Sequence, residues 1–399
     1  MGQVEELAPD VFSVGVKHWN RRVFDNVFIL PYGTSYNAYL VKGKQKTALI
    51  DTTLAGFESE LLDNIRQVED PAKIDYVVMN HAEGDHAGGI PKLLEVAHGS
   101  TLVTSIKGKE FAEAFYLVDP SRIRTVKDMD QIDLSGKILT FVDAPWLHWP
   151  ETMFTYLEPD RILFPCDFFG AHFASSKLYA DEVGELPLES KRYYTIIMAP
   201  YGQAAAAKNA VEKVGDLNVK MIAPSHGPIH RYPEQIIESY RRWANRQTVP
   251  KVVAAYGTMY GNTEALTKEV VKGIVSEGVE ASVYDLSISD SSYVVGDALD
   301  AAGIVVGTPT MDGVPFPPVT MFVELVKLTR MRNKISGIVG DFGWSGGAVT
   351  QVRKQLESID FQIVGTVEVR GKPKSDELSK ARELGKAIAK RIIQGEIPK

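Results

Sequence analysis

Cysteine is nearly absent from this chain. Cys166 is its only cysteine among 399 residues. One cysteine excludes an internal disulfide, a thiolate zinc site and a cysteine-ligated iron–sulfur cluster within a single chain. The N-terminus is acidic and has no apolar signal-peptide core. Both features lead us to expect a cytoplasmic protein.

Long apolar runs and an excess of positive charge are also missing. No apolar segment has the length of a membrane span, and the net charge of −7 gives no support to nucleic-acid binding. We therefore expect neither a membrane nor a nucleic acid as a partner. A chain of 399 residues exceeds one ordinary core, so two domains are expected.

Strand-like segments follow one another in the first part of the chain, with few helices between them. Residues 35–41 and 46–50 flank a turn and predict a hairpin, and residues 57–68 have helical spacing. Further strands are expected at 74–79, 102–104, 138–142, 152–156 and 161–164. We expect two stacked sheets with helices outside. Residues 180–193 have no clear pattern, whereas 193–214 and 235–246 favour helices.

The pattern changes near Pro250. Expected strands at 251–256, 279–284, 303–306, 335–339 and 361–364 alternate with expected helices at 263–276, 319–329, 347–356 and 375–393. Strand–helix alternation of this length predicts an α/β domain with a doubly wound parallel sheet. We expect one domain over residues 1–249 and a second over 250–399.

Residues 81–86, His-Ala-Glu-Gly-Asp-His, place four metal-binding side chains on a loop after the expected strand 74–79. Sites in α/β folds usually lie at such strand ends. Three later candidates each follow a strand-like run as well. The seven candidate ligands are His81, Glu83, Asp85, His86, His148, Asp167 and His226.

Seven imidazole and carboxylate ligands suit two metal ions if one carboxylate bridges them, and the set fits non-haem iron, manganese or zinc. Alternate residues of an extended loop point the same way, so we expect His81, Glu83 and Asp85 to face one metal and His86 the other. Buried carboxylates without partners are costly, which argues against a packing role for this loop. Position alone leaves a structural role equally open for the three later candidates. Ordinary core or surface roles are expected for His18, His98 and His230.

The loop at 257–263, Gly-Thr-Met-Tyr-Gly-Asn-Thr, lies between an expected strand and an expected helix. Hydroxyls, glycines and backbone N–H groups at a helix N-terminus bind anions. No lysine follows as in a nucleoside triphosphate loop, so the phosphate of flavin mononucleotide (FMN) is the expected guest. The alternative is a helix N-cap formed by Asn262 or Thr263.

Two later loops end the third and fourth strands of the same domain, where this kind of fold binds ligands. Trp344 can stack on the isoalloxazine ring or pack beneath its own loop. The expected FMN-binding residues are Thr258, Met259, Tyr260, Gly261, Asn262, Thr263, Thr308, Pro309, Thr310, Met311, Asp312, Gly313, Gly343, Trp344, Ser345, Gly346, Gly347 and Ala348.

The motif of residues 81–86, with the three later ligands, resembles the metal site of the flavodiiron proteins (A-type flavoproteins), and the three loops beyond Pro250 resemble those of flavodoxins. The resemblance implies a metallo-β-lactamase-like αββα sandwich followed by a flavodoxin-like domain. Asp51 resembles an aspartate of that sandwich outside the metal ligands. Hydrolases of this fold usually have histidine where this chain has Glu83. The carboxylate implies a diiron site, because an anionic oxygen ligand stabilises ferric iron.

The resemblance implies FMN and two non-haem iron ions per chain. One iron would be bound by His81, Glu83 and His148, and the other by Asp85, His86 and His226. Asp167 would bridge them. His172 is expected close to the irons, and Tyr193 or Tyr194 as a hydrogen-bond donor to oxidised substrate, although a packed tyrosine is the alternative.

The implied reaction passes electrons through FMN to the iron pair and reduces nitric oxide to nitrous oxide, dioxygen to water, or both. The chain has no Cys-x-x-Cys motif, so a separate rubredoxin is the expected donor, with a deazaflavin as the alternative. A head-to-tail homodimer, or a dimer of such dimers, is implied.

Two other functions stay open at this point. One is a dizinc hydrolase with a flavodoxin-like regulatory domain, and the other is an electron carrier with a structural metal domain. The chain also departs from the family pattern. Relatives often have His and Tyr within the stretch 20–31, where this chain has Asp25-Asn26-Val27-Phe28. The sequence therefore does not rank nitric oxide against dioxygen.

Overall fold

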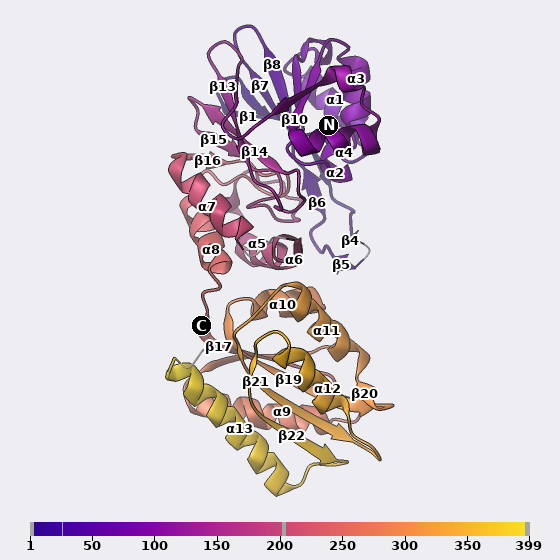
Figure 1. Ribbon diagram of the computed structural model, residues 1–399, viewed down its shortest axis with the longest axis vertical. Coiled ribbons are helices and arrows are strands. Elements are labelled where there is room, and N and C mark those ends of the chain that lie inside the picture. The colour runs from indigo at the N-terminus through magenta and orange to yellow at the C-terminus, as the bar shows by residue number, and fades with distance from the viewer. Residues whose placement is uncertain (1–3, 26, 202–204, 396–399) are drawn as a thin grey trace. The chain divides into compact units, whose positions relative to one another are not determined.

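The computed structural model describes residues 4–25, 27–201 and 205–395. The chain divides into two compact units, Met1–Ala244 and Asn245–Lys399, which Figure 1 shows in indigo to pink and in orange to yellow. The expected boundary at 249/250 falls at the start of the first strand of the second unit, β17 (Val249–Tyr256). Within the described ranges, no helix is long and apolar enough to cross a membrane.

The first unit contains two large sheets. The seven-stranded sheet has the order β1-β2-β7-β8-β9-β10-β11, and its strands from β8 to β11 are parallel. The five-stranded sheet has the order β12-β13-β14-β15-β16. The bounds are β1 (Glu5–Ala8), β2 (Val11–Ser13), β7 (Tyr39–Lys42), β8 (Thr47–Ile50), β9 (Tyr76–Val78), β10 (Thr101–Ser105), β11 (Ile123–Val126), β12 (Gln131–Asp133), β13 (Ile138–Asp143), β14 (Met153–Glu158), β15 (Ile162–Phe164) and β16 (Met221–Ile222).

Side chains of one strand alternate between two cores. Tyr39 and Val41 of β7 belong to the core between the two sheets, together with Phe141 of β13. Leu40 points to the other face and packs with Leu61 of α1 (Glu58–Arg66). The alternation follows from the two-residue repeat of a pleated strand. It confirms the prediction of two stacked sheets with helices outside, and β7 and β8 form the predicted hairpin.

Several elements of this unit were not expected from the sequence. Two helices, α3 (Ile90–Val96) and α4 (Ile106–Tyr116), pack against the seven-stranded sheet on the face that also contacts α1. Short strand pairs are formed by β3 (Val16–His18) with β6 (Thr34–Tyr36) and by β4 (Val23–Phe24) with β5 (Phe28–Ile29). Asn26, between β4 and β5, lies outside the described residues.

The expected start of a helix at residue 193 was wrong. Helix α5 (Leu186–Tyr193) begins within the segment that had no clear pattern, and it continues through a π-helical turn at Tyr194–Met198 into α6 (Ala199–Tyr201). Two charged side chains of α5, Glu189 and Arg192, are buried as an ion pair. They replace apolar residues on the buried face, so the helical period of hydrophobicity is hidden. Residues 202–204 lie outside the described chain, and α7 (Ala206–Asp216) and α8 (Glu234–Ala244) follow.

The second unit is a parallel sheet with the order β18-β17-β19-β21-β22, as predicted. Helices α9 and α13 pack on one face of the sheet (Figure 1), and α10 was not expected. The bounds are β18 (Glu280–Asp285), β19 (Ala301–Met311), β20 (Val314–Pro315), β21 (Ile335–Phe342), β22 (Gln362–Arg370), α9 (Asn262–Ser276), α10 (Ser291–Ala298), α11 (Pro317–Leu328), α12 (Ala348–Glu357) and α13 (Ser375–Ile393). The order reverses between β17 and β19, so the loops after these strands meet at the switch point.

Candidate metal centre and flavin site

The loop after β9 changes conformation within the predicted motif. Glu83 is extended, and a single helical turn, α2 (Gly84–Ala87), follows it. The expectation that Asp85 shares a site with His81 and Glu83 was wrong, because the alternation of an extended chain ends at Gly84. The helical turn instead directs Asp85 and His86 toward the same place.

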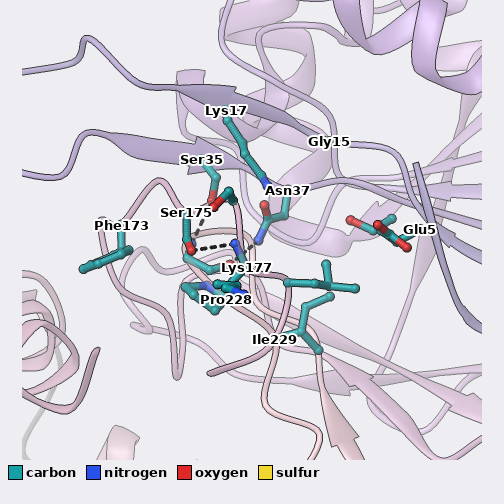
Figure 2. Close-up of a pocket in the computed structure, with 14 residues that line it drawn as sticks. Glu5, Gly15, Lys17, Ser35, Asn37, Phe173, Ser175, Lys177, Pro228 and Ile229 are labelled. Atoms are coloured by element: carbon teal, nitrogen blue, oxygen red, sulfur yellow. Dashed lines mark hydrogen bonds between the residues drawn. The ribbon is translucent and has the colours of Figure 1, made fainter. Parts of the chain in front are cut away.

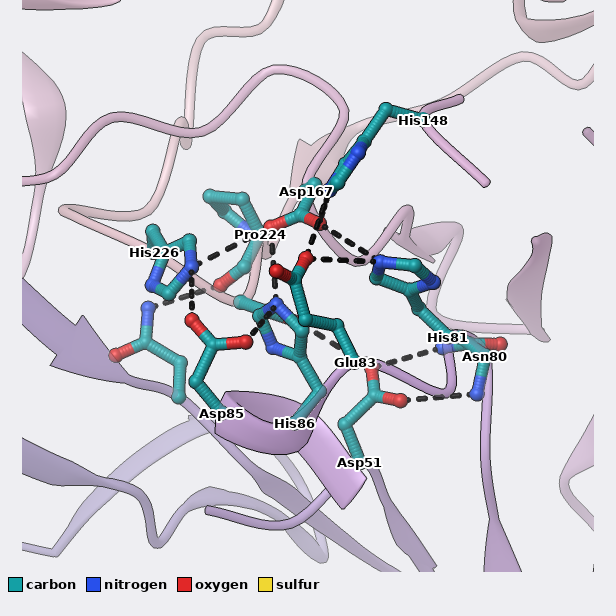
Figure 3. Close-up of polar contacts among 12 residues, drawn as sticks. Asp51, Asn80, His81, Glu83, Asp85, His86, His148, Asp167, Pro224 and His226 are labelled. Atoms are coloured by element: carbon teal, nitrogen blue, oxygen red, sulfur yellow. Dashed lines mark hydrogen bonds and ion pairs between the residues drawn. The ribbon is translucent and has the colours of Figure 1, made fainter. Parts of the chain in front are cut away.

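The structure brings the seven predicted ligands together in two adjoining groups, which Figure 3 shows. The first group is His81, Glu83, His148 and Asp167, whose potential ligand atoms lie within 4.8 Å of one another. The second is Asp85, His86 and His226, within the same limit.

Asp167 lies between the two groups and turns one oxygen toward each. Its Oδ2 lies 3.6 Å from His81 Nε2 and 3.4 Å from His148 Nε2. Its Oδ1 lies 3.1 Å from His86 Nε2 and 3.4 Å from His226 Nε2. A carboxylate placed in this way can bridge two metal ions.

Strand ends explain why these distant residues meet. His81 follows β9, Asp167 follows β15 and His226 follows β16. Asp51, after β8, ties two of these loops together. Its carboxylate accepts hydrogen bonds from the backbone N–H of Asn80 at 2.9 Å and from Ser225 Oγ at 3.2 Å. Asp51 therefore supports the site from outside the two ligand groups.

Backbone and side-chain groups also hold the His226 loop. His226 Nδ1 lies 2.5 Å from the Ser35 carbonyl oxygen. Ser35 Oγ accepts a hydrogen bond from Gly227 N, and Asn37 Nδ2 donates one to Gly227 O, both at 2.8 Å. These residues line a small polar cavity of about 40 Å³ (Figure 2). His226 does not line this cavity, and the hydrogen bonds of Ser35 and Asn37 are what hold its loop.

Two further residues that support the metal site were also missed by the sequence analysis. Glu151 Oε1 lies 2.7 Å from His81 Nδ1, and Thr34 Oγ1 lies 3.3 Å from His226 Nδ1. Glu151 is close in sequence to His148, which is a usable signal for a site residue. Thr34 offered none, because β6 reaches the site only through the tertiary fold.

The residues present fit a pair of cations. Both carboxylate oxygens of Asp85, both ring nitrogens of His86 and Oδ2 of Asp167 are buried without a hydrogen bond of acceptable geometry in the described structure. Unpaired buried polar atoms are costly, so their grouping points to a missing partner. Burial disfavours the charged form of His86, but the charges of Asp167 and Asp85 outweigh it and hold the pKa of His86 well above its usual value. The site thus attracts positive charge.

The three predicted catalytic residues fall in different surroundings. Tyr193 donates a 2.7 Å hydrogen bond to Asp167 Oδ1. The ring centre of His172 lies 4.6 Å from that of His226, and burial together with the charge of His226 holds the pKa of His172 well below its usual value. Tyr194 instead packs against Tyr240, with ring centres 5.0 Å apart. The structure brings Tyr193 and His172 to the metal site and places the Tyr194 ring in an aromatic cluster.

The other histidines of the first unit lie outside the two ligand groups. His18 Nδ1 pairs with the Tyr36 hydroxyl at 3.0 Å, His230 Nε2 donates to the Phe169 carbonyl at 3.1 Å, and His98 is exposed. These surroundings agree with the ordinary roles expected for them.

The first predicted FMN loop lies at the N-terminus of α9. Gly261 is the N-cap residue at φ +81°, and no side chain caps the helix. The alternative of a cap by Asn262 or Thr263 was wrong, because both side chains donate to the Asp341 carboxylate. Thr258 Oγ1 accepts a 3.0 Å hydrogen bond from Gly261 N and so shapes the loop. The helix N-terminus is left available for an anion.

The three loops expose flat and polarisable side chains. Tyr260 is 87% exposed and Trp344 is 84% exposed, so Trp344 does not pack beneath its own loop. Met259 and Met311 are also exposed, and Thr310 Oγ1 is buried without a hydrogen-bond partner in the described structure. Exposed aromatic faces beside an uncapped helix N-terminus fit a flavin ring with a phosphate tail.

A sandwich of two sheets with a two-cation site, followed by a flavodoxin-like sheet with a flavin site, defines an electron-transferring metalloflavoprotein. Residues 34–227 match the ODP family beta lactamase, and residues 255–385 match flavodoxin.

The chain is similar along its length to known proteins. It is 36% identical over 399 residues to a nitric oxide reductase of Moorella thermoacetica, covering 98% of this chain and 100% of that one. It is 34% identical over 401 residues to a flavo-diiron protein of Clostridium acetobutylicum, covering 97% and 99%. The rubredoxin oxygen:oxidoreductase of Desulfovibrio gigas superimposes with a TM-score of 0.94 at 29% identity, covering 99% and 100%.

The chain belongs to the flavodiiron protein family. It is an oxidoreductase that combines FMN with a non-haem diiron site. The predicted family, fold class and cofactors are confirmed.

Proposed function

We propose that this protein reduces nitric oxide to nitrous oxide and water, dioxygen to water, or both, with electrons that arrive through FMN. The observation that carries the proposal is Asp167, whose two oxygens face two separate groups of imidazole and carboxylate ligands. The proposed iron ligands are His81, Glu83, Asp85, His86, His148, Asp167 and His226. Relatives named nitric oxide reductase and rubredoxin oxygen:oxidoreductase support this reading.

An iron pair held by these residues would supply Lewis-acid and redox chemistry for a diatomic gas. The protein groups hold the geometry. Glu83 and Asp85 place one carboxylate in each ligand group. Tyr193 fixes Asp167, and because burial raises the pKa of Tyr193 well above its usual value, its hydroxyl stays protonated and keeps donating. His172 is kept neutral beside His226. Tyr194 remains a weaker candidate for a catalytic role.

FMN is proposed to bind at the three loops after β17, β19 and β21. The phosphate is expected at the α9 N-terminus, within the loop that Thr258 and Gly261 shape. The isoalloxazine ring is expected against the exposed faces of Tyr260 and Trp344. FMN accepts and releases electrons singly or in pairs, which suits it to feed an iron pair.

A separate electron donor is proposed. The sequence has one cysteine, Cys166, and a rubredoxin iron is bound by cysteine pairs. A rubredoxin is the proposed donor, since the similar protein of Desulfovibrio gigas is a rubredoxin oxygen:oxidoreductase, and a reduced deazaflavin is the alternative. The proposed location is the cytoplasm.

A head-to-tail homodimer, or a dimer of such dimers, is proposed as the active form. Each unit exposes apolar side chains near its own site. In the first unit the exposed side chains are Ile29 of β5 and Val27, which precedes this strand. In the second unit they are Tyr260 and Trp344, which lie on the proposed flavin loops. In the proposed dimer the flavin of one copy would serve the iron pair of the other.

An anaerobic assay tests the proposal. Protein of measured iron and flavin content is mixed with reduced rubredoxin, or with a reduced deazaflavin, and the consumption of nitric oxide and of dioxygen is followed separately. Donor-dependent consumption of at least one gas is expected. Two zinc ions per chain with hydrolysis that needs no flavin would identify a dizinc hydrolase instead. Flavin reduction without gas consumption would identify an electron carrier.

A further inference from the structure

We propose that Glu151 is a positioning residue that makes the two iron positions electronically unequal. It acts through His81 and keeps the iron at His81, Glu83 and His148 at a lower reduction potential than the iron of the second group. The inference rests on the proposed ligand set, and on no particular substrate.

Glu151 is held against His81 from outside the metal site. Its side chain is 2% exposed. Its Oε1 lies 2.7 Å from His81 Nδ1 and accepts a 2.9 Å hydrogen bond from the backbone N–H of Ala82. His81 presents its other nitrogen, Nε2, to Glu83 and Asp167. A carboxylate thus lies directly behind one metal-facing imidazole.

The other three imidazoles have no such partner. His226 Nδ1 faces the neutral carbonyl of Ser35 at 2.5 Å. The Nδ1 atoms of His86 and His148 have no hydrogen-bond partner among the residues described. Among the residues that the structure describes, His81 alone of the four ligand histidines has a carboxylate hydrogen-bonded to its Nδ1.

A carboxylate that accepts the Nδ1–H of a metal-bound histidine makes the ring a stronger electron donor. A stronger donor favours the ferric over the ferrous ion, and the low dielectric of a buried site enlarges the effect. With iron bound, the group formed by Asp85, His86 and His226 would therefore hold the iron of higher reduction potential, and the His81 group the iron of lower potential. The protein residues would in this way fix the order in which the two positions are reduced.

Glutamine can replace Glu151 with little change of shape. The amide oxygen can accept both bonds that Oε1 accepts now. The amide nitrogen would take the place of Oε2, which has no partner in the described structure. Glu151 also borders a cavity of about 180 Å³. Glu151→Gln therefore removes the charge and keeps the hydrogen bonds.

The test is a redox titration of the FMN- and iron-loaded protein, followed by the EPR signal of the half-reduced iron pair. Glu151→Gln should keep two irons per chain and shift the ferric–ferrous equilibrium of one iron toward ferrous by about tenfold, which is about 59 mV for one electron. Glu151→Asp keeps the charge, so its iron reduction potentials should be closer to those of the parent protein. Thr152→Val is the matched control, because Thr152 Oγ1 is a neutral group 3.4 Å from His81 Nδ1, and it should leave the potentials unchanged.

Two results would overturn the proposal. One is Glu151→Gln with two irons and unshifted potentials, which means that Glu151 only holds the ring in place. The other is Glu151→Asp shifted as far as Glu151→Gln. If Glu151→Gln fails to keep both irons, the proposal is tested instead on the EPR spectrum of the half-reduced parent protein. One mixed-valence EPR species supports a fixed order, whereas two species in equal amounts contradict it. Because these signals need no substrate, they are independent of the gas-reduction assay.

Discussion

Tyr193 and Asp167 are joined by a hydrogen bond of 2.7 Å from the phenolic hydroxyl to Oδ1. The same oxygen lies 3.1 Å from His86 Nε2. The tyrosine therefore fixes the carboxylate that lies between the two ligand groups, and it does so from the side of the second group.

Tyr193→Phe removes this hydrogen bond and keeps the ring. Groups outside the metal ligands typically contribute 10- to 100-fold to metal affinity or activity, so we expect a turnover rate lower by about tenfold with FMN content unchanged. Tyr194→Phe is the comparison, because the Tyr194 ring packs against Tyr240 and Trp243 and that packing is retained. Equal decreases of the turnover rate in the two variants would contradict a specific role of the Tyr193 hydroxyl.

Asp85→Asn should empty or weaken the second iron position. Asp85 lies 3.2 Å from His226 Nε2 and 3.3 Å from His86 Nε2 through its two oxygens, and the amide loses the anionic ligand. Iron analysis should show a decrease from two ions per chain toward one, with the flavin absorbance unchanged. The exposed Asp63→Asn serves as the control and should keep both irons. Normal iron content and turnover in Asp85→Asn would contradict the ligand assignment.

Thr258→Leu should release FMN and leave the iron in place. The Thr258 hydroxyl accepts a bond from Gly261 N, so the substitution removes the group that shapes the loop and adds bulk beside the expected phosphate. Absorbance of the purified protein measures the flavin, and donor-driven turnover should fall with it. Direct iron analysis is the control. Full retention of FMN would show that the phosphate binds elsewhere.

The burial of His230 leads us to expect that the folded protein loses stability in acid. Burial lowers its pKa from 6.5 to about 4, although its bond to the Phe169 carbonyl opposes the shift. The unfolded chain takes up a proton on this residue below about pH 6.5 and the folded protein only below about pH 4. The contribution of neutral His230 to the free energy of unfolding is therefore fully present above the pKa that His230 has in the unfolded chain. This contribution is lost as the pH falls toward the pKa that His230 has in the folded protein.

His230→Gln tests this linkage, because glutamine can still donate to the carbonyl and does not titrate. The free energy of unfolding of the parent, relative to the variant, should fall by roughly 3 kcal/mol between pH 7.5 and 4. Denaturant titrations of both proteins at several pH values measure the difference. A constant difference over this range would show that His230 does not set the acid stability.

Parts of the site could be predicted from the sequence because their functional side chains lie within short segments. Residues 81–86 put four metal-binding side chains in six positions, and the loop 257–263 puts hydroxyls and glycines before a helix. The helix at α5 was missed, since the buried pair of Glu189 and Arg192 hides its apolar face. The argument from an extended loop placed Asp85 on the wrong side, because a single turn of helix depends on its surroundings more than on its own six residues. The family resemblance placed Asp85 with His86 and His226, where the structure has it.

The sequence by itself indicated two kinds of domain, the ligand motif at residues 81–86 and an anion-binding loop at 257–263, because hydrophobic period and residue chemistry are properties of short segments. The three later ligands were assigned only through the family resemblance. The family resemblance implied how those ligands divide around Asp167, and the tertiary structure agrees with that division. Only the tertiary structure decided that the helical turn after Glu83 carries Asp85 away from the His81 group, and that Glu151 lies behind His81. Such relationships depend on strand ends that are far apart in the chain and meet only when the two sheets pack. Their distances are set by packing, which local sequence does not encode.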